Sequence, residues 1–123
     1  MNIYRCPVCG NIIVKLSDSK AALFCCGEQM KLLKANTSDG ALEKHVPKVT
    51  VIGNDVEVVI GEVVHPMIQQ HYIEWILLET EKGHQIKYLH PEQEPKHSFS
   101  LKDDKLVAVY EYCNLHGLWK KEM

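Results

Sequence analysis

Four of the five cysteines lie within the first 26 residues, so the N-terminal part of the chain is expected to fold around its sulfur atoms. Cys6 and Cys9 form a Cys-x-x-Cys pair, and Cys25 and Cys26 are adjacent in sequence. A segment this short buries little apolar surface, and below about 40 residues a metal or disulfides are usually needed for stability. Residues 1–36 are therefore expected to form a small four-cysteine metal domain.

The choice between disulfides and a metal depends on the cellular compartment. The N-terminus, Met-Asn-Ile-Tyr-Arg-Cys, has no apolar segment typical of a signal peptide, which predicts a cytoplasmic protein with reduced cysteines. Metal ligation is then favoured over disulfides. Four thiolates in a tetrahedron suit zinc or a single iron, and the spacing does not choose between these metals.

The overall composition argues against two other classes of protein. Apolar residues make up 46% and charged residues 24% of the chain, as in ordinary globular proteins. A formal net charge of -2 without a basic run argues against a nucleic-acid partner. No apolar stretch approaches the ~18 residues that a membrane span requires, so no membrane partner is expected.

After a polar segment at Ala35–Gly40, which we interpret as a linker, the chain becomes a series of short apolar segments. In one of them Val56, Val58 and Ile60 share a face, as in a strand. Turn residues separate the segments, and no capped helical run is present. This pattern predicts an all-β sandwich for residues 37–123. The expected strands are Lys48–Ile52, Val56–Val64, Tyr72–Glu79, Ile86–Leu89, Ser98–Leu101 and Leu106–Tyr112.

Four of the seven histidines lie in short, distinctive segments of this second domain. His45 precedes Val-Pro, His65 and His71 flank one short segment, and His116 follows Cys113 in a Cys-x-x-His pair. Imidazole suits iron, copper, zinc and nickel, and Cys-x-x-His places a thiolate and an imidazole on one turn. Spacing alone leaves ligand and ordinary roles equally open. The other three histidines are expected to be ordinary polar residues of loops: His84, His90 and His97.

Two parts of the sequence resemble known families. The Cys-x-x-Cys pair followed by an adjacent Cys-Cys pair resembles the desulforedoxin domain, which binds one rubredoxin-like iron. Three later stretches resemble the signature of superoxide reductases in the family's order: Glu-Lys-His-Val-Pro, His-Pro-Met-x-x-x-His-x-Ile-x-Trp and Cys-Asn-x-His-Gly-x-Trp. Together the similarity covers nearly the whole chain and is to desulfoferrodoxins, the two-iron superoxide reductases.

This resemblance implies a mainly β protein, with a desulforedoxin-like domain followed by an immunoglobulin-like β-sandwich. It implies reduction of superoxide to hydrogen peroxide at a non-haem ferrous centre with an open sixth site, without dioxygen production. It also implies two mononuclear irons per chain. One would be bound by Cys6, Cys9, Cys25 and Cys26, and the catalytic iron by His45, His65, His71 and His116 with an axial thiolate from Cys113.

The resemblance also implies roles for two residues beside His45. Lys44 would attract the superoxide anion, and its ordinary alternative is a solvated surface lysine. Glu43 is similar to the family glutamate that occupies the sixth position in the oxidised state, and its alternative is a plain loop carboxylate. The family further implies a rubredoxin-like electron donor and a homodimer.

Two other functions stay open on the sequence alone. A zinc-stabilised β-sandwich could serve as an interaction module without catalysis. A histidine-rich metal hydrolase is less favoured, because catalytic zinc usually takes three protein ligands plus water and the resemblance implies five.

Overall fold

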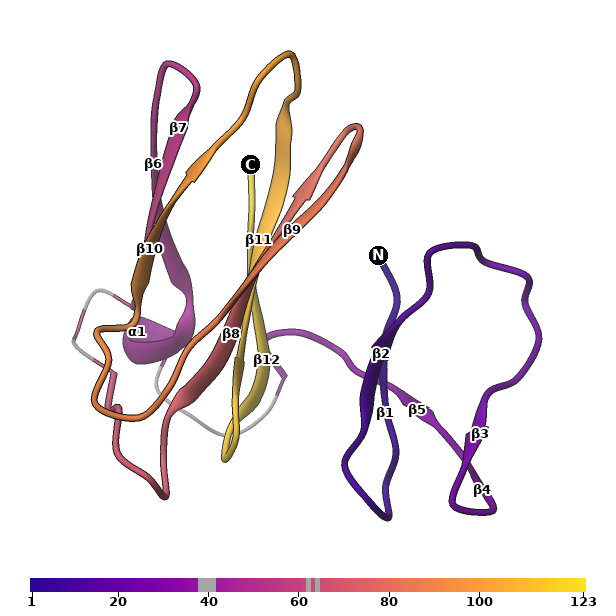
Figure 1. The fold of residues 1–123 in the computed structure, drawn as a ribbon. Coiled ribbons are helices and arrows are strands. Elements are labelled where there is room, and N and C mark those ends of the chain that lie inside the picture. Colours follow the sequence, from indigo (N-terminus) through magenta and orange to yellow (C-terminus); the bar gives the residue numbers. More distant parts are fainter. Residues whose placement is uncertain (38–41, 62, 64) are drawn as a thin grey trace. The chain divides into compact units, whose positions relative to one another are not determined.

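The computed structural model describes residues 1–37, 42–61, 63 and 65–123 of the chain, which Figure 1 shows as a ribbon. The chain forms two compact units, Met1–Lys34 and Ala35–Met123. Both are built from strands, as expected for a mainly β protein. Within the described ranges, no helix has the length and apolar character needed to cross a membrane.

The first unit consists of very short strands with few buried side chains. It contains β1 (Ile3–Arg5), β2 (Ile12–Val14), β3 (Phe24–Cys25), β4 (Glu28–Gln29) and β5 (Lys31–Leu32). β1 pairs antiparallel with β2 and β5, and β3 pairs with β4. Three apolar side chains of the unit are buried, Ile3, Cys6 and Met30. Burying such a side chain stabilises by about 1.5–3 kcal/mol, whereas ordering each backbone residue costs about 1–2 kcal/mol. The unit therefore needs a further source of stability.

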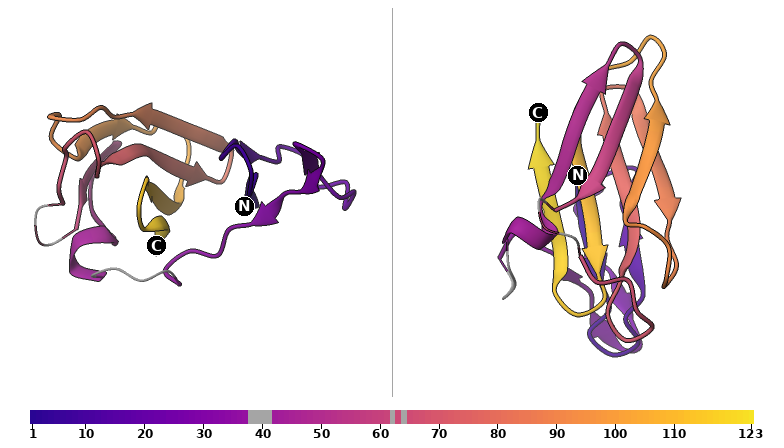
Figure 2. Two further views of the ribbon diagram at one scale, coloured as in Figure 1. Left: turned by 90° about the horizontal axis from the view of Figure 1, so that it is seen from below. Right: turned by 90° about the vertical axis from the view of Figure 1, so that its left-hand side faces the viewer.

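The second unit is a sandwich of two antiparallel sheets. One sheet has the strand order β10-β7-β6 and the other β12-β11-β8-β9. Figure 1 labels β6, β7 and β10 on one side of this unit and β8, β9, β11 and β12 on the other, and Figure 2 gives two further views. The strands are β6 (Pro47–Ile52), β7 (Asp55–Ile60), β8 (Ile73–Thr80), β9 (Gly83–Tyr88), β10 (Lys96–Ser100), β11 (Leu106–Cys113) and β12 (Gly117–Glu122).

The hydrophobic core lies between these two sheets. Val56, Val58 and Ile60 of β7 are all buried, which confirms the predicted alternation. The facing sheet contributes residues such as Ile76 and Val109. The cluster has twelve buried members, so burial of apolar side chains can stabilise this unit, whereas the first unit buries too few of them. They are Val56, Val58, Ile60, Ile73, Ile76, Leu78, Leu89, Phe99, Leu101, Leu106, Val109 and Cys113.

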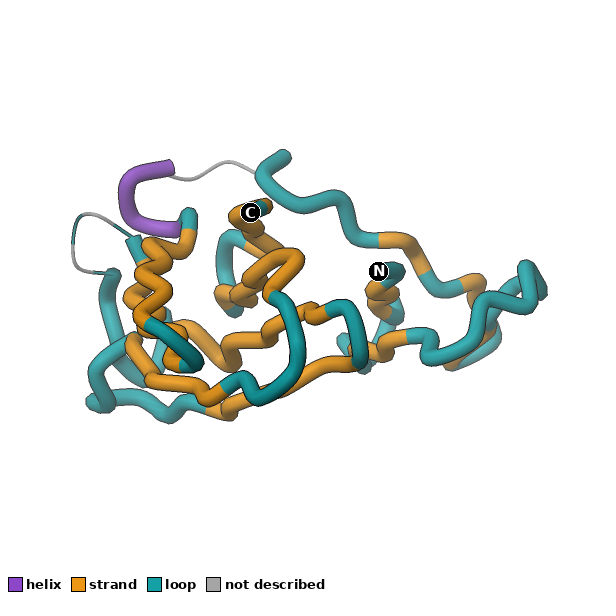
Figure 3. Tube along the Cα trace, turned by 90° about the horizontal axis from the view of Figure 1, so that it is seen from above, coloured by secondary structure: helices purple, strands orange, loops and turns teal. Residues whose placement is uncertain are grey.

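The structure differs from the expected elements in four main places. The strand expected over Ile86–Leu89 is β9, which begins three residues earlier, at Gly83. The strand predicted to run to Val64 ends at Ile60, because Gly61 takes a left-handed backbone conformation with a φ of 78°. Residues 62 and 64 lie outside the described residues. A strand that was not expected, β12, pairs with β11 from Gly117 onward. A single helical turn, α1 (Leu42–His45), drawn in purple in Figure 3, stands where no helix was expected.

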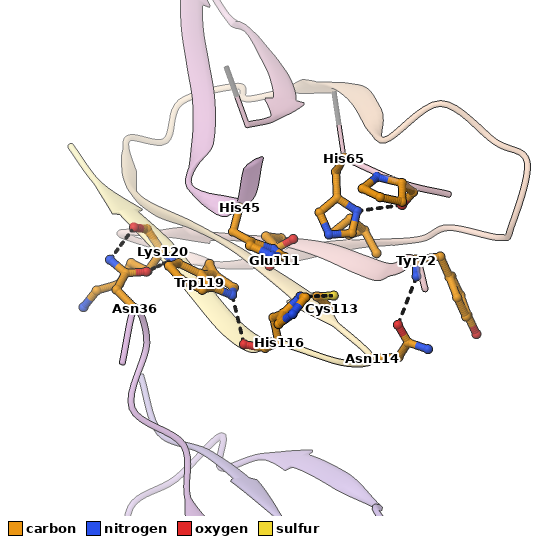
Figure 4. Close-up of polar contacts among 12 residues, drawn as sticks. Asn36, His45, His65, Tyr72, Glu111, Cys113, Asn114, His116, Trp119 and Lys120 are labelled. Atoms are coloured by element: carbon orange, nitrogen blue, oxygen red, sulfur yellow. Dashed lines mark hydrogen bonds and ion pairs between the residues drawn. The ribbon is translucent and has the colours of Figure 1, made fainter. Parts of the chain in front are cut away.

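The expected linker is described only as far as residue 37. Within it, the backbone N–H of Asn36 donates to the carbonyl of Leu118 at 3.0 Å. The side-chain Oδ1 of Asn36 accepts from the backbone N–H of Lys120 at 2.8 Å. These bonds, of which Figure 4 shows the second, hold Asn36 against β12 in the second unit.

Candidate metal centre

Five side chains from three separate stretches meet at one end of the sandwich. His45 ends α1, His65 and His71 lie in the connection from β7 to β8, and Cys113 and His116 lie at the turn from β11 to β12. The five donor atoms all lie within 4.8 Å of one another. Figure 4 labels four of these residues and shows that their side chains point toward one another: His45, His65, Cys113 and His116.

The turn from β11 to β12 carries its two donors beside an irregularity in the sheet. The register between β11 and β8 shifts between Tyr112 and Cys113, where β8 has one residue more than β11, and such bulges are common next to functional sites. Cys113 is fully buried, and its Sγ lies 3.8 Å from Nδ1 of His116. Trp119 donates its ring N–H to the carbonyl of His116 at 3.0 Å, which fixes the end of the turn.

Asn114 joins the two loops that carry these donors. Its Oδ1 accepts a hydrogen bond from the backbone N–H of Tyr72 at 3.0 Å, and its Nδ2 donates to the carbonyl of Gln70 at 3.0 Å. Its backbone N–H also donates to the carbonyl of Tyr72 at 3.2 Å. The segment that carries His71 is therefore held against the turn that carries Cys113.

Several ring nitrogens at the centre have no hydrogen-bond partner. Nε2 of His65 and Nε2 of His71 are buried and unbonded among the described residues. Nδ1 of His65 lies 2.6 Å from the carbonyl of Pro66, a contact that requires a proton on Nδ1 and leaves the lone pair on Nε2. Unpartnered imidazole nitrogens grouped with a thiol fit a metal that accepts nitrogen and sulfur ligands, such as iron.

Burial keeps these imidazoles in their neutral form. Desolvation, with a smaller contribution from the neighbouring histidines, lowers the pKa of His45 to about 3. It also lowers the pKa of His65 to about 4 and that of His71 below its usual value. Neutral imidazole is the form that binds a metal. Burial raises the pKa of the Cys113 thiol, so a cation is needed to hold its sulfur as a thiolate.

The two charged residues singled out beside His45 lie in α1. The side chain of Lys44 is exposed, and its charge lowers the pKa of His45, His65 and His71. The positive field of Lys44 therefore reaches three of the donor rings. The side chain of Glu43 lies outside what the structure describes.

The four N-terminal cysteines form a second donor group, again with all donor atoms within 4.8 Å of one another. Sγ of Cys9 lies 3.7 Å from Sγ of Cys25, which lies 3.9 Å from Sγ of Cys26. A tetrahedron with metal–sulfur bonds of about 2.3 Å has edges of about 3.8 Å. The sulfur separations therefore fit a single tetrahedral metal ion.

The electrostatics of this cysteine group also indicate a cation. The backbone N–H groups of Cys9 and Val8 donate to Sγ of Cys6 at 3.4 Å each. The bond from Cys9 is the main reason that the pKa of Cys6 falls to about 6. The neighbouring thiols, Cys9 first, raise the pKa of Cys26 to about 12. Cys26 therefore needs a nearby cation, such as a bound metal, to be held as a thiolate beside the other sulfurs. No disulfide joins any of the five cysteines.

One buried carboxyl group at the centre was not expected from the sequence. Glu111 on β11 is fully buried, and desolvation raises its pKa well above the usual range. Its Oε1 lies 4.0 Å from Nδ1 of His45. The sequence does indicate this residue, because Glu111 is an acidic residue in an apolar strand and lies two residues before Cys113, on the same face of the strand.

The remaining histidines lie outside both donor groups. His84 and His90 are exposed, and the ring of His97 packs edge-on against Phe99 at 4.7 Å between centroids. His90 lies in a loop as expected, whereas His84 lies on β9 and His97 on β10, so the loop placement expected for these two histidines was wrong.

Comparison with known proteins decides the family. The family model "Desulfoferrodoxin" matches residues 37–122, and the model "Desulfoferrodoxin, N-terminal domain" matches residues 1–33. The chain belongs to the desulfoferrodoxin family. Desulfoferrodoxins bind iron, and this chain has a four-cysteine group and a four-histidine, one-cysteine group to hold it.

Individual relatives match this desulfoferrodoxin over nearly its full length. The desulfoferrodoxin of Nitratidesulfovibrio vulgaris is 50% identical over 120 residues, which cover 98% of this chain and 94% of the relative. A desulfoferrodoxin homolog of Archaeoglobus fulgidus is 45% identical, with 98% and 95% covered. Among solved structures, the superoxide reductase from Treponema pallidum matches with a TM-score of 0.81 at 35% identity, covering 98% of both chains.

Proposed function

We propose that this desulfoferrodoxin is a superoxide reductase. It catalyses the one-electron reduction of superoxide to hydrogen peroxide and produces no dioxygen. The observation that carries the proposal is the convergence of four imidazoles and one thiol at one end of the sandwich. The superoxide reductases of Treponema pallidum and Giardia intestinalis share the fold, with TM-scores of 0.81 and 0.58 at 35% and 36% identity.

The proposal gives each donor group a role. In the domain formed by residues 37–123, the catalytic iron would be held by His45, His65, His71, Cys113 and His116. Five protein donors leave one position of a six-coordinate ion for the substrate. In the domain formed by residues 1–36, the other iron would be held by Cys6, Cys9, Cys25 and Cys26.

Ferrous iron, when bound, would supply one electron and act as a Lewis acid toward the substrate. Superoxide takes up that electron and two protons, and the balanced product is hydrogen peroxide. Cys113 would contribute electron density from its thiolate, the effect that a thiolate ligand also has in haem proteins. The buried, neutral histidines add no positive charge of their own, so the charge of Lys44 would add to that of the iron in attracting the anion.

Replacing Lys44 by alanine should slow superoxide reduction by about tenfold at low ionic strength, because steering by a nearby cation raises the encounter rate. The difference from wild type should shrink as salt rises and screens the charge. The rate of superoxide reduction, measured by stopped flow or after pulsed generation of superoxide at several salt concentrations, shows both effects. The matched control is Lys102→Ala, which removes another exposed lysine beyond the opposite end of β11. An unchanged rate in the Lys44 variant, or equal slowing in the control, would remove the steering role.

Replacing Glu43 by alanine should leave the reaction of the ferrous protein nearly intact and alter the visible spectrum of the ferric protein. The reason is that the proposed role of this carboxylate is confined to the oxidised state. Glu81→Ala, which changes an exposed carboxylate in the β8–β9 turn, should leave both spectra as in wild type. Identical ferric spectra for the Glu43 variant and wild type would contradict carboxylate ligation.

We extend the proposal to the partners and the location of the protein. A rubredoxin-like protein would return the ferric iron to its ferrous state in each turnover. A homodimer would cover apolar side chains of the first unit such as Leu16 and Phe24, which are 87% and 69% exposed. Five free cysteines suit a reducing cytoplasm.

Metal analysis separates this function from a zinc-stabilised interaction module, which the comparisons do not support. The proposal predicts two irons per chain and visible absorption from ferric thiolate. A single zinc and a colourless protein would contradict it.

A further inference from the structure

Glu111 is a polar side chain placed where the fold alone does not require one. It is fully buried on the inward face of β11, beside the core residues Val109 and Cys113. Neither of its carboxyl oxygens has a hydrogen-bond partner among the described residues. A buried polar group without a partner destabilises a fold, so an apolar side chain would serve packing better.

A ring nitrogen close to this carboxyl also lacks a hydrogen-bond partner among the described residues. His45 is 1% exposed, and its Nδ1 is buried and unbonded among the residues described. Nδ1 of His45 lies 4.0 Å from Oε1 of Glu111. A hydrogen bond between them needs about 3 Å, so a shift of about 1 Å would satisfy both groups.

Three aromatic rings packed around His45 hold its imidazole ring in one orientation, which determines which ring nitrogen faces the carboxyl group of Glu111. Its ring stacks on Trp119 with 4.7 Å between centroids and 11° between planes. The rings of His65 and His116 lie edge-on to it, at 4.6 Å and 4.9 Å. With Nδ1 toward Glu111, the nitrogen left for the donor group is Nε2. Figure 4 shows His45 between Trp119 and the other donors, with Glu111 beside it.

We propose that Glu111 is a positioning residue, which accepts a hydrogen bond from Nδ1–H of His45 and so presents Nε2 of that ring to the iron. A metal-bound histidine commonly donates its second N–H to a carboxyl or carbonyl group, which fixes its tautomer and its orientation. Glu111 itself is not a ligand, because the converging donor atoms do not include its oxygens. The inference rests on the proposed function, since it assumes that the five-donor centre binds iron.

The test compares two substitutions in the full-length protein. Glu111→Met removes both oxygens at similar length, and Glu111→Gln keeps one carbonyl oxygen as an acceptor. Competition with a ferrous chelator under anaerobic conditions measures the affinity of the five-donor site for ferrous iron. The methionine variant should bind iron ~10–100-fold more weakly, the usual effect of losing such a partner, and its ferric thiolate band should shift. The glutamine variant should stay close to wild type.

A second readout separates positioning from packing. In the metal-free protein, Glu111→Met should unfold at the same or a higher temperature than wild type, because it removes unpaired buried oxygens. A packing role would instead lower the melting temperature together with the iron affinity. Val109→Ala, a cavity-forming change on the same face of β11, is the control that should lower the melting temperature and leave iron affinity unchanged.

Four outcomes would overturn the inference. The methionine variant could bind iron as tightly as wild type, the glutamine variant could lose as much affinity as the methionine variant, or the metal-free methionine variant could melt below wild type while also losing iron affinity. Each of these three results would remove the role of Glu111 and leave the proposed function intact. Failure of the wild-type five-donor site to bind iron would instead refute the proposed function, and the inference with it.

Discussion

Replacing Cys113 by serine should reduce the iron content from two atoms per chain to one and abolish rapid reduction of superoxide. Serine offers no thiolate, and the sulfur it replaces is fully buried and grouped with four imidazoles. Loss of an outer hydrogen-bond partner already costs about 10–100-fold in metal affinity or activity, so loss of a direct donor should exceed that. His116→Ala should have the same effect, because it removes another donor of the same group.

The spectrum of the remaining iron shows whether the two sites are independent. In either variant the absorption of the four-cysteine iron should persist, because its donors all lie in the first unit. His84→Ala, at an exposed position on β9, should keep both irons. Loss of both irons from the Cys113 variant, or retention of both, would contradict two separate centres.

The second large effect is expected in the first unit. Cys6→Ser should remove its metal and unfold Met1–Lys34, because only three of its apolar side chains are buried. Structural zinc sites in small domains contribute about 10–16 kcal/mol of apparent binding free energy, comparable to the ~5–15 kcal/mol that stabilises a whole protein. Amide exchange and limited proteolysis should therefore show an unprotected N-terminal segment, while the five-donor centre keeps its iron.

The matched control for this change lies in the same Cys-x-x-Cys loop. Val8 is 60% exposed and contributes its backbone N–H to Sγ of Cys6, a bond that Val8→Ser preserves. That variant should keep its metal and its amide protection. A Cys6→Ser protein whose first unit stays protected without metal would show that the unit folds by packing after all.

Much of this architecture could be predicted from sequence because metal donors are few and chemically distinctive. The Cys-x-x-Cys and Cys-Cys pairs define a four-sulfur group, and the structure brings those sulfurs together. The alternation of Val56, Val58 and Ile60 predicts a half-buried strand, and all three side chains face the core. Such local patterns predict well, because they depend on spacing along the chain.

The features that were missed depend on contacts between distant segments. β12 contains Lys120, Lys121 and Glu122 near its end and lacks a clear apolar alternation, yet it is a strand because β11 offers it a partner edge. The bulge before Cys113 arises from the register with β8. The sequence of one strand, taken without the strands that pair with it, cannot indicate either feature.

The burial of Glu111 could not be predicted for the same reason, because it also depends on contacts between distant segments. A glutamate in a strand is usually assigned to the solvent face, and only the structure shows that the side chain of Glu111 on β11 is fully buried. Its significance depends on His45, which comes from a helical turn 66 residues earlier in the chain. Only the folded structure places the two groups 4.0 Å apart.

Pulse radiolysis of the ferrous protein tests the central claim most directly. Superoxide generated in a short pulse should oxidise the iron of the five-donor centre in a reaction that is first order in each partner. Each superoxide consumed should yield one hydrogen peroxide, with no dioxygen released. Iron that stays ferrous after the pulse, or dioxygen formed in the proportion that dismutation requires, would contradict the account.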